Sequence, residues 1–369
     1  MRIVLIGGGH SHVEVLRRFA AAPVAGAELV LVSPDAATPY SGMLPGLVAG
    51  HYSFDETHIE LGPLATAAGA RFVRDRVVAL DLGAQRAHLA SGGDEPYDLA
   101  SLDVGSTPDL SVSGAREHAV GVKPVAAFLD WWRGQELAVG SGELRSITVV
   151  GGGAGGVELL LAMQFRLADR CRGPLPAFHL VSSEPRLLAR HTRAVGDWLA
   201  RRLAERTVAL TLAATVTTVL PGALVVADGR RLPADRIVFV TGAAAAPWLA
   251  ASGLACDATG FVEVDAHLRS TSHPCVFAAG DCAAQQGFPR PKSGVYAVRQ
   301  GPPLAANLRA AALGLPLVAY APQRRALALV SAGDRRAIAS YGPLAVAGHW
   351  VWRWKDRIDR RFMARYRHG

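Results

Sequence analysis

The stretch Arg2–Leu16, RIVLIGGGHSHVEVL, decides the fold. A short apolar run leads into three glycines and then into an amphipathic helix start, which is the order of a buried parallel strand that turns sharply into a helix. Gly7 is placed to make the tight turn, and Gly9 to let a pyrophosphate approach the backbone. We expect the helix to point its N-terminal N–H groups at the phosphates. His12 stands where the third glycine of the fingerprint belongs.

The same pattern recurs, complete, in the stretch 147–163, ITVVGGGAGGVELLLAM. Gly151, Gly153 and Gly156 again follow an apolar strand, and Glu158 lies inside the helix that comes next. A single match also occurs in ordinary glycine-rich turns between a strand and a helix. Two matches about one domain length apart predict two dinucleotide-binding units.

Length and charge are consistent with two domains and an appendage. The chain has 369 residues, half of them hydrophobic, and a formal charge of +8. The charge comes from arginine, because the only lysines are Lys123, Lys292 and Lys355. This balance favours anionic cofactors or an anionic membrane surface. No basic run in the main body is interleaved with aromatic residues, so we expect no nucleic-acid partner.

The four cysteines form neither a CxxC pair nor a close set of metal ligands. Such usage fits a reducing cytoplasm, where we expect the protein to reside. No apolar run reaches the roughly 18 residues of a membrane-spanning helix. His10 and His12, one residue apart and without a further cluster, make a poor zinc site, so we expect no metal.

Apolar strands alternate with helices along the chain, which predicts an α/β fold with parallel sheets. In the first part we expect a strand at 28–32 ending at Ser33, a turn-rich loop at 38–46, a strand pair at 70–82, a strand within 98–108 that ends in Gly105, and a helix at 124–135. In the second part we expect strands at 178–181, 208–226, 236–240, 261–264 and 275–279, then a helix at 295–312 and a strand-like, then basic region at 327–369.

The order of these glycine motifs resembles that of the two-dinucleotide-binding-domain flavoproteins, the pyridine nucleotide-disulfide oxidoreductase superfamily. More narrowly the chain resembles type II NADH dehydrogenases and sulfide:quinone reductases. It is most similar to the flavin domain found beside or fused to selenophosphate synthetase. Four phrases carry that likeness: GGGHSHVEVLRRF, TPYSGMLPGLVAGHYSFDE, PKSGVYAVRQGPPLAANL and WVWRWKDRIDRRFMARY.

The resemblance implies two Rossmann-like domains, with the NAD(P)H-binding one inserted into a split FAD-binding one. The FAD domain would comprise residues 1–115 and 262–322, the NAD(P)H domain 116–261, and a small C-terminal region 323–369. Expected FAD contacts are Gly7, Gly9, His10, Ser33, Met43, Leu44, Pro45, Val78, Gly105, Gly280 and Asp281. Expected NAD(P)H contacts are Gly151, Gly153, Gly156, Ser182 and Gly242.

The implied chemistry is hydride transfer from nicotinamide to flavin N5, with the cofactors carrying the reactivity. Glu158 matches a glutamate that the family places near the ring stack, where it would hold the carboxamide or relay a proton. A solvated helix-start carboxylate is the plainer alternative. Lys292, Tyr296 and Gln300 are candidates for an acceptor site beside the flavin, with packing and capping as their alternative.

We therefore expect an FAD-dependent NAD(P)H oxidoreductase that passes electrons to a quinone or another small acceptor. The chain lacks the CxxxxC of the disulfide reductases, and Cys171 has no convincing partner for sulfide oxidation. Alternatives are a flavin reductase linked to selenium or sulfur metabolism, and an FAD-bound interaction module without turnover. Ser33 and Ser182, which stand where acidic residues are usual, favour the last of these.

The terminal stretch 349–368 combines aromatic and basic residues. Trp350, Val351, Trp354, Ile358, Phe362 and Tyr366 recur at helical spacing and are predicted to form one face. Tryptophan and arginine favour the boundary of an anionic membrane, so we expect peripheral contact with the inner membrane face. Packing on the flavin domain, or across a homodimer interface, is the alternative.

Overall fold

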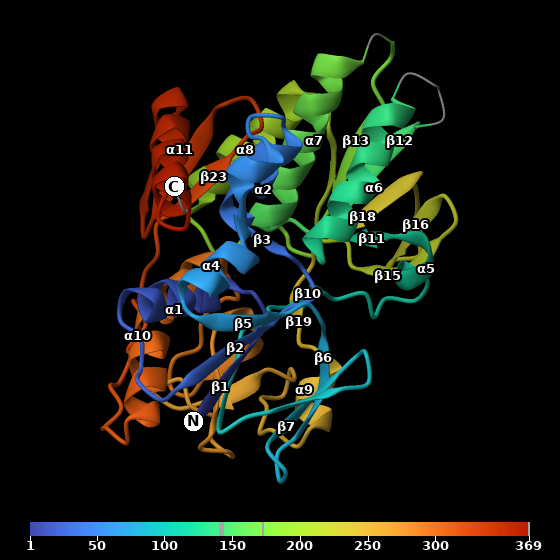
Figure 1. Cartoon of the computed structure of the whole chain (residues 1–369). Helices are drawn as coiled ribbons and strands as arrows, with labels where there is room; N and C mark the ends of the chain where they lie inside the picture. Colours follow the sequence, from blue (N-terminus) through green and yellow to red (C-terminus); the bar gives the residue numbers. More distant parts are fainter. Residues whose placement is uncertain (140–143, 172, 368–369) are drawn as a thin grey trace.

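The computed structural model describes residues 1–139, 144–171 and 173–367. Two five-stranded parallel sheets form the centres of its two halves (Figure 1). The first sheet has the order β21 (Val276–Ala278), β9 (Leu99–Leu102), β1 (Arg2–Ile6), β2 (Glu28–Val32) and β5 (Ala70–Val73). The second has the order β11 (Val120–Gly121), β18 (Arg236–Phe239), β12 (Ser146–Val150), β13 (Ala177–Val181) and β14 (Ala209–Thr211). The α/β fold class predicted from the sequence is confirmed.

Each sheet is built around its glycine turn. β1 is fully apolar beyond Arg2 and lies between β9 and β2, so its side chains are buried on both faces. β12 holds the same central place in the second sheet, between β18 and β13. The chain leaves each of these strands into a helix, α1 (His10–Ala21) and α7 (Ala154–Arg170) respectively.

Strand β21 joins the first sheet although it lies far along the chain. It pairs in parallel with β9, so residues near 276 return to the sheet that residues 2–102 begin. Between these two parts come all five strands of the second sheet. The long helix α10 (Gly294–Ala312) follows β21 and packs along α1. The helices that pack beside the sheets are α4 (Leu61–Ala67), α6 (Val125–Ala138) and α8 (Arg193–Glu205).

Small two- and three-stranded elements surround the sheets, and all of those named below are antiparallel except the parallel pair of β20 and β22. One meander is β6 (Val77–Asp81), β7 (Arg86–Leu89) and β8 (Asp94–Pro96), and the other is β15 (Val216–Leu220), β16 (Ala223–Val226) and β17 (Arg231–Pro233). The pairs are β3 (Ala37–Pro39) with β4 (His58–Glu60), β10 (Thr107–Pro108) with β19 (Ala243–Ala244), and β20 (Val262–Val264) with β22 (Ala283–Gln285). Short helices are η1 (Ser41–Met43), α2 (Leu44–Val48), α3 (Phe54–Thr57), α5 (Ala115–His118), α9 (Pro247–Ala251) and η2 (Gly280–Cys282). The strand pair expected at 70–82 is wrong, because β5 and β6 belong to different sheets.

The C-terminal part consists of a three-stranded sheet and one helix. The strands are β23 (Ala328–Ser331), β24 (Ala337–Tyr341) and β25 (Leu344–Gly348), and the helix is α11 (His349–Met363). Val351, Phe362 and Tyr366 are buried, whereas Trp350, Trp354 and Ile358 are exposed. The single aromatic face predicted for this helix is therefore wrong: its residues divide between an inward and an outward side.

Helix α10 contains a glycine that generates a stability prediction. A methyl group at Gly301 would overlap the side chain of Glu14 on α1, because the two helices are in close contact there. We expect Gly301→Ala to lower the free energy of unfolding by about 1 to 3 kcal/mol, the usual cost of overpacking.

The matched control is Gly134→Ala in α6, where the added methyl group would meet no atom within 4 Å. That change should raise stability by about 0.5 to 1 kcal/mol, since glycine is a poor helix former. Thermal unfolding followed by circular dichroism measures both. Equal shifts for the two variants would contradict the packing argument.

Candidate functional site

The carboxyl ends of β1, β9 and β21 meet at one edge of the first sheet. Gly7 follows β1 with φ +96°, and a Cβ atom there would overlap the backbone of Asp103, which follows β9. Gly280, after β21, has φ +69° and would likewise overlap Asp103 if it carried a side chain. Two turns that only glycine fits thus enclose one aspartate.

The Asp103 carboxylate caps the N-terminus of α1. Its Oδ2 accepts hydrogen bonds from the backbone N–H groups of Ser11 at 2.8 Å and His12 at 3.1 Å. Burial raises the pKa of Asp103 to about 7, against these two hydrogen bonds, which lower it. The expectation that the helix points its N-terminal N–H groups at phosphates is therefore wrong for Ser11 and His12, because both N–H groups already donate to the Asp103 side chain.

The two histidines of the first turn have different environments. His12 is buried, with Nδ1 2.7 Å from the carbonyl oxygen of Gly7 and Nε2 2.8 Å from Ser101 Oγ, so it packs α1 against the sheet. His10 has an enclosed Nε2 with no partner among the described residues. Burial lowers the pKa of both rings to about 4, so both are neutral at pH 7.

Asp281, at the start of η2, carries an ion pair to the other half of the molecule. Its Oδ2 lies 3.0 Å from Lys123 Nζ and accepts a hydrogen bond from Ser106 Oγ at 3.2 Å. Lys123 stands between β11 and α6, in the second half. Beside this pair, the Gln300 side chain accepts a hydrogen bond from Gly280 N at 2.7 Å.

The loop that includes the expected flavin residues Met43, Leu44 and Pro45 lies between the two halves. Met43 is fully buried in the core of the first half, whereas Leu44 packs in the core of the second, against α7. Ser33 is buried at the end of β2 with its hydroxyl near Gly8.

Two further expected flavin residues differ in placement. Gly105 follows β9 with φ +69° and open space around it. Val78 lies instead on the β6–β7–β8 sheet with its side chain 43% exposed. The structure does not bring the Val78 side chain together with the glycine turns.

The second glycine turn has the geometry of a complete fingerprint. Gly151 has φ +135°, and a Cβ at Gly156 would overlap the Gly151 carbonyl, so α7 starts very close to β12. Gly153 precedes α7 and is open around its Cα. Ser182, buried at the end of β13, has its side chain directly beside Gly152. Gly242 follows β18 at the same edge and is exposed.

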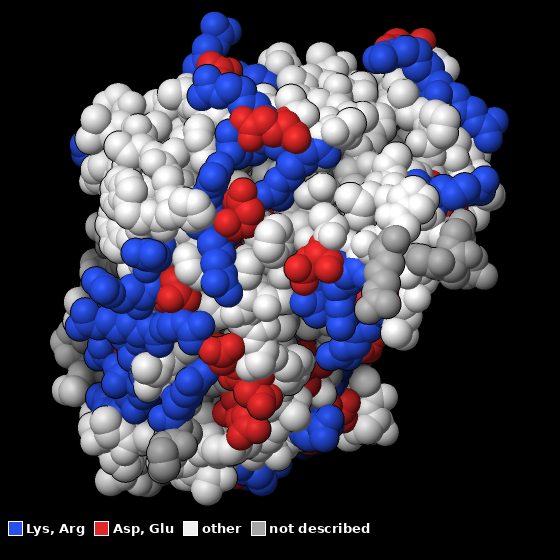
Figure 2. Space-filling model, turned by 90° about the horizontal axis from the view of Figure 1, so that it is seen from above, with Lys and Arg blue, Asp and Glu red and all other residues white. Residues whose placement is uncertain are grey.

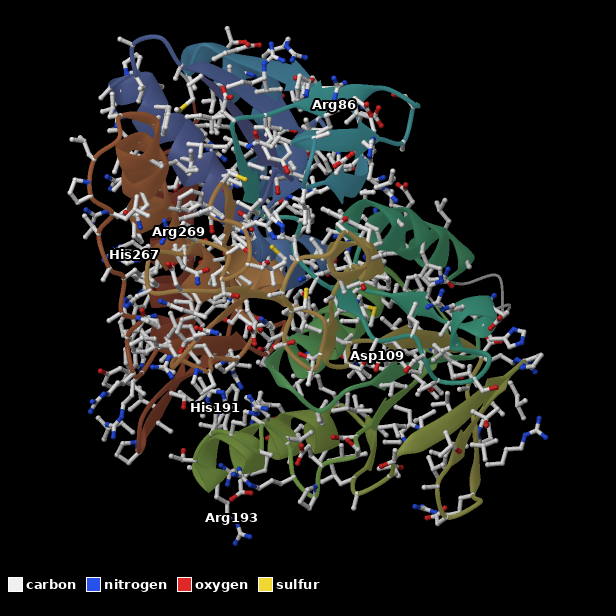
Figure 3. The ribbon with its side chains drawn as sticks, turned by 90° about the horizontal axis from the view of Figure 1, so that it is seen from below. Arg86, Asp109, His191, Arg193, His267 and Arg269 are labelled. Atoms are coloured by element: carbon white, nitrogen blue, oxygen red, sulfur yellow. The ribbon has the colours of Figure 1, made fainter. Side chains whose placement is uncertain are left out.

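The loop after Ser182 is held by its own arginine. Arg186 donates to the backbone carbonyl oxygens of Leu188, Ala189 and His191, so its guanidinium is already engaged. His191 in turn lies 2.9 Å, Nδ1 to Oγ, from Ser340 of β24 (Figure 3). This loop therefore joins the second half to the C-terminal sheet.

Glu158 points at the C-terminal part and is not a solvated helix-start residue. Its Oε1 accepts from Ser331 N at 2.7 Å and from Ser331 Oγ at 3.0 Å. Burial raises the pKa of Glu158, and the nearby Lys355 opposes that rise. Lys355, on α11, donates to Asp359 at 2.6 Å and to the carbonyl of Gly42 at 2.5 Å.

A cavity of about 410 Å³ opens beside Asp281. Lys292 and Tyr296 line it, and so do Gly280 and Gln300. Lys292 Nζ donates to the Ala283 carbonyl at 2.6 Å and lies 3.8 Å from the centre of the Phe261 ring. Burial lowers the pKa of Lys292. The sequence-predicted acceptor residues thus share one cavity with the GD turn.

Residues 1–301 match the model of one protein family, the pyridine nucleotide-disulphide oxidoreductases. The chain belongs to this family. Its members bind FAD and NAD(P)H. The chain has no CxxxxC pair that could form the redox disulfide of the family name, and its cysteines Cys171, Cys256, Cys275 and Cys282 are not disulfide-bonded.

Individual relatives agree with this assignment. An NADH dehydrogenase-like protein of Mycobacterium tuberculosis is 28% identical over 233 residues, which cover 61% of this chain and 58% of the relative. The match thus spans little more than half the length of that relative. A sulfide:quinone oxidoreductase structure from Aquifex aeolicus covers 99% of this chain and 91% of its own, with TM-score 0.83 and 18% identity. The NDH2 of Plasmodium falciparum in complex with NADH covers 98% and 97%, with TM-score 0.78 and 12% identity. These two likenesses show the fold.

The residues at the first glycine turn fit an FAD. The enclosed Nε2 of His10 has no partner among the described residues, and Gly105 leaves open backbone next to Ser106, which donates to Asp281, whereas Gly9 packs against the Asp103 carboxyl. Asp103 and Lys123, which lie at this edge, were not predicted as site residues from the sequence. The signal for Asp103 was present, since a charged residue directly follows an apolar strand whose carboxyl end must face the glycine turn. Lys123 had no such signal.

The buried Asp103 predicts a pH effect on stability. The folded chain keeps a proton on this carboxyl between about pH 4 and about pH 7, whereas the unfolded chain has lost it. This group therefore makes the free energy of unfolding fall as the pH rises through that window. Asn cannot lose a proton and can still cap α1. The free energy of unfolding of Asp103→Asn minus that of wild type should thus be higher at about pH 8 than at about pH 5, by roughly 2 kcal/mol.

Urea unfolding of both proteins at the two pH values measures this difference. The neutral histidines His10 and His12 are present in both proteins, so their titration cancels. A variant-to-wild-type difference that is the same at both pH values would contradict the assignment of the proton to Asp103.

Proposed function

We propose that the chain is an FAD-dependent NAD(P)H oxidoreductase that passes hydride from nicotinamide to flavin N5 and then electrons to a quinone or another small acceptor. One observation carries this: the two glycine turns belong to two halves that meet at the Met43–Leu44 loop, each residue packing in a different core. Two ring systems held by the two turns would meet at that loop. FAD, when bound, supplies an acceptor of hydride that releases electrons singly or in pairs.

The first half would hold FAD and the second NAD(P)H. Asp281 would bind the ribityl or phosphate region, and the backbone of Gly8, Gly9 and His10 would meet the pyrophosphate in place of Ser11 and His12. The return of β21 to the first sheet supports the proposal that residues 1–115 and 262–322 form the FAD domain and residues 116–261 the NAD(P)H domain. Ser182 would bind the adenosine ribose without repelling a 2′-phosphate.

Glu158 would act at the nicotinamide side. Its raised pKa and its bonds to Ser331 give a carboxyl that could hold a carboxamide N–H or pass a proton. Lys292 and Tyr296, in the cavity beside Asp281, would contact the acceptor. The Lys292 ammonium is partly desolvated, and it suits a quinone oxygen because that oxygen gains negative charge on reduction.

Two other activities remain as second candidates. The likeness to the flavin domain associated with selenophosphate synthetase supports a flavin reductase linked to selenium or sulfur metabolism. Ser33 and Ser182 support an FAD-bound interaction module without turnover, because neither provides the carboxylate usual at the ribose. Reduction of the flavin by a nicotinamide separates the module from both enzymes.

We expect the purified protein to be yellow with one non-covalent FAD, and both NADH and NADPH to bleach it anaerobically. Because Arg186 is engaged by carbonyls and Ser182 is neutral, kcat/KM for NADH and NADPH should agree within roughly tenfold.

Asp281→Ala should lose FAD. The control is Asp109→Ala, an exposed carboxylate on the loop after β10 (Figure 3). Full FAD occupancy in Asp281→Ala would remove that residue from the cofactor site, and no bleaching of wild type would favour the module.

The exposed side of α11 supports peripheral contact with an anionic membrane. Trp350 and Trp354 stack at 6.4 Å, and Ile358 continues their line, with the exposed Arg353 and Arg357 beside them. Seen from above, Lys and Arg gather on the side of the molecule where α11 lies (Figure 2). Among the described residues, no helix is long and apolar enough to span a bilayer.

This proposal predicts salt-sensitive binding to vesicles of phosphatidylcholine with phosphatidylglycerol. Trp350→Gln, Trp354→Gln and Ile358→Gln together should reduce co-sedimentation at least about tenfold, because three interfacial side chains are lost. These residues are exposed, so the fold should survive. The control is Leu137→Gln, an 85% exposed leucine on α6. Equal sedimentation of wild type and the triple variant would contradict membrane contact through α11.

A further inference from the structure

Lys123 contacts Ser106 and Asp281 of the first half although it belongs to the second half of the molecule. It stands between β11, an edge strand of the second sheet, and α6. Its ammonium nevertheless reaches the edge of the first sheet, 3.0 Å from Asp281 Oδ2 and 3.3 Å from Ser106 Oγ. Ser106 also donates to Asp281, so the three side chains form a closed triangle.

The acid Asp103 and a second ammonium, that of Lys292, both interact with Asp281 of this triangle. Asp103 lies behind it, and the charge of Asp281 contributes to the raised pKa of Asp103. His10, the nearest ring, is neutral because burial lowers its pKa to about 4, and Lys123 pushes in the same direction. A diphosphate ester would add further negative charge here. A cation at this position therefore has an electrostatic purpose beyond its single ion pair.

Burial of the pair gives the contact its strength. The Asp281 side chain is 15% exposed and Lys123 36%, so the pair is intermediate between a surface and a buried salt bridge. Removing one partner of such a pair leaves the other charge partly desolvated without compensation. Without Lys123 the Asp281 carboxylate loses its ion-pair partner and would repel the phosphates of a dinucleotide more strongly.

We propose that Lys123 is a positioning residue of the flavin site. Its ammonium orients the Asp281 carboxylate toward the ribityl chain of FAD and offsets the negative charge at the pyrophosphate. Retention of FAD by the first half thereby depends on a side chain of the second half, so the docking of the two halves and the affinity for flavin are coupled. The inference rests on the proposed FAD site at Asp281.

The experiment compares FAD release from the purified holoproteins, followed as the rise of flavin fluorescence after dilution. Lys123→Met should speed release about tenfold, which corresponds to ~1.4 kcal/mol. Lys123→Arg keeps the cation and should stay within roughly twofold of wild type. The matched control is Arg116→Met on α5, an exposed cation of the same half. Lys123→Gln serves as a second neutral variant if Lys123→Met fails to fold.

A double-mutant cycle with Asp281→Asn tests whether Lys123 acts through Asp281. In the Asp281→Asn background, Lys123→Met should change the release rate less than roughly threefold, because the carboxylate it compensates is gone. Release from Lys123→Met at the wild-type rate, or slower, would overturn the inference, as would a full tenfold effect that persists in the Asp281→Asn background. Wild type purified without FAD would instead contradict the proposed function itself.

Discussion

The hydrogen bonds from the N-terminus of α1 to Asp103 are the constraint on which the first half depends. They join β9, β1 and α1 at a single buried carboxyl, and the neighbouring glycine turns leave no room for another side chain. The same carboxyl takes up part of the helix dipole that a dinucleotide fold usually offers to phosphate. Charge balance at this edge must therefore come from elsewhere, and Lys123 of the second half provides a cation there.

The C-terminal part connects the two halves at the opposite side of the Met43–Leu44 loop. α11 contacts this loop through Lys355 and Gly42, and the Tyr366 hydroxyl donates to Glu14 of α1 at 3.0 Å. β23 contacts the second half through Ser331 and Glu158. Removing α11 would thus expose the first core and alter the environment of Glu158, whereas its outward tryptophans can change without either effect. Catalytic and surface roles of this region are separable for that reason.

The glycine turns and the alternation of strands and helices could be predicted from the sequence because they rest on local rules: an apolar strand, a turn that needs glycine, and a helix. The α/β class and the family assignment are confirmed on that basis. Contacts between distant segments had no local signal. Nothing near Lys123 indicates Asp281, 158 positions away, and nothing in α11 separates Val351 and Phe362, which pack inward, from Trp354, which is exposed. The burial pattern of α11 depends on the sheet beneath it, which amphipathic spacing alone cannot reveal.

The placement of titratable groups follows one physical rule on both sides of the central loop. Asp103 and Glu158 are both partly or fully desolvated carboxyls with raised pKa values, and each has a lysine from a different segment nearby, Lys123 through Asp281 and Lys355 directly. A raised pKa favours the protonated, uncharged form of each acid, and that form repels phosphates less than a carboxylate does. Because both lysines come from other segments than the acids they face, the electrostatics of the site exist only in the assembled molecule. The chain uses just three lysines, and each of them lies at this central region or at the adjoining cavity.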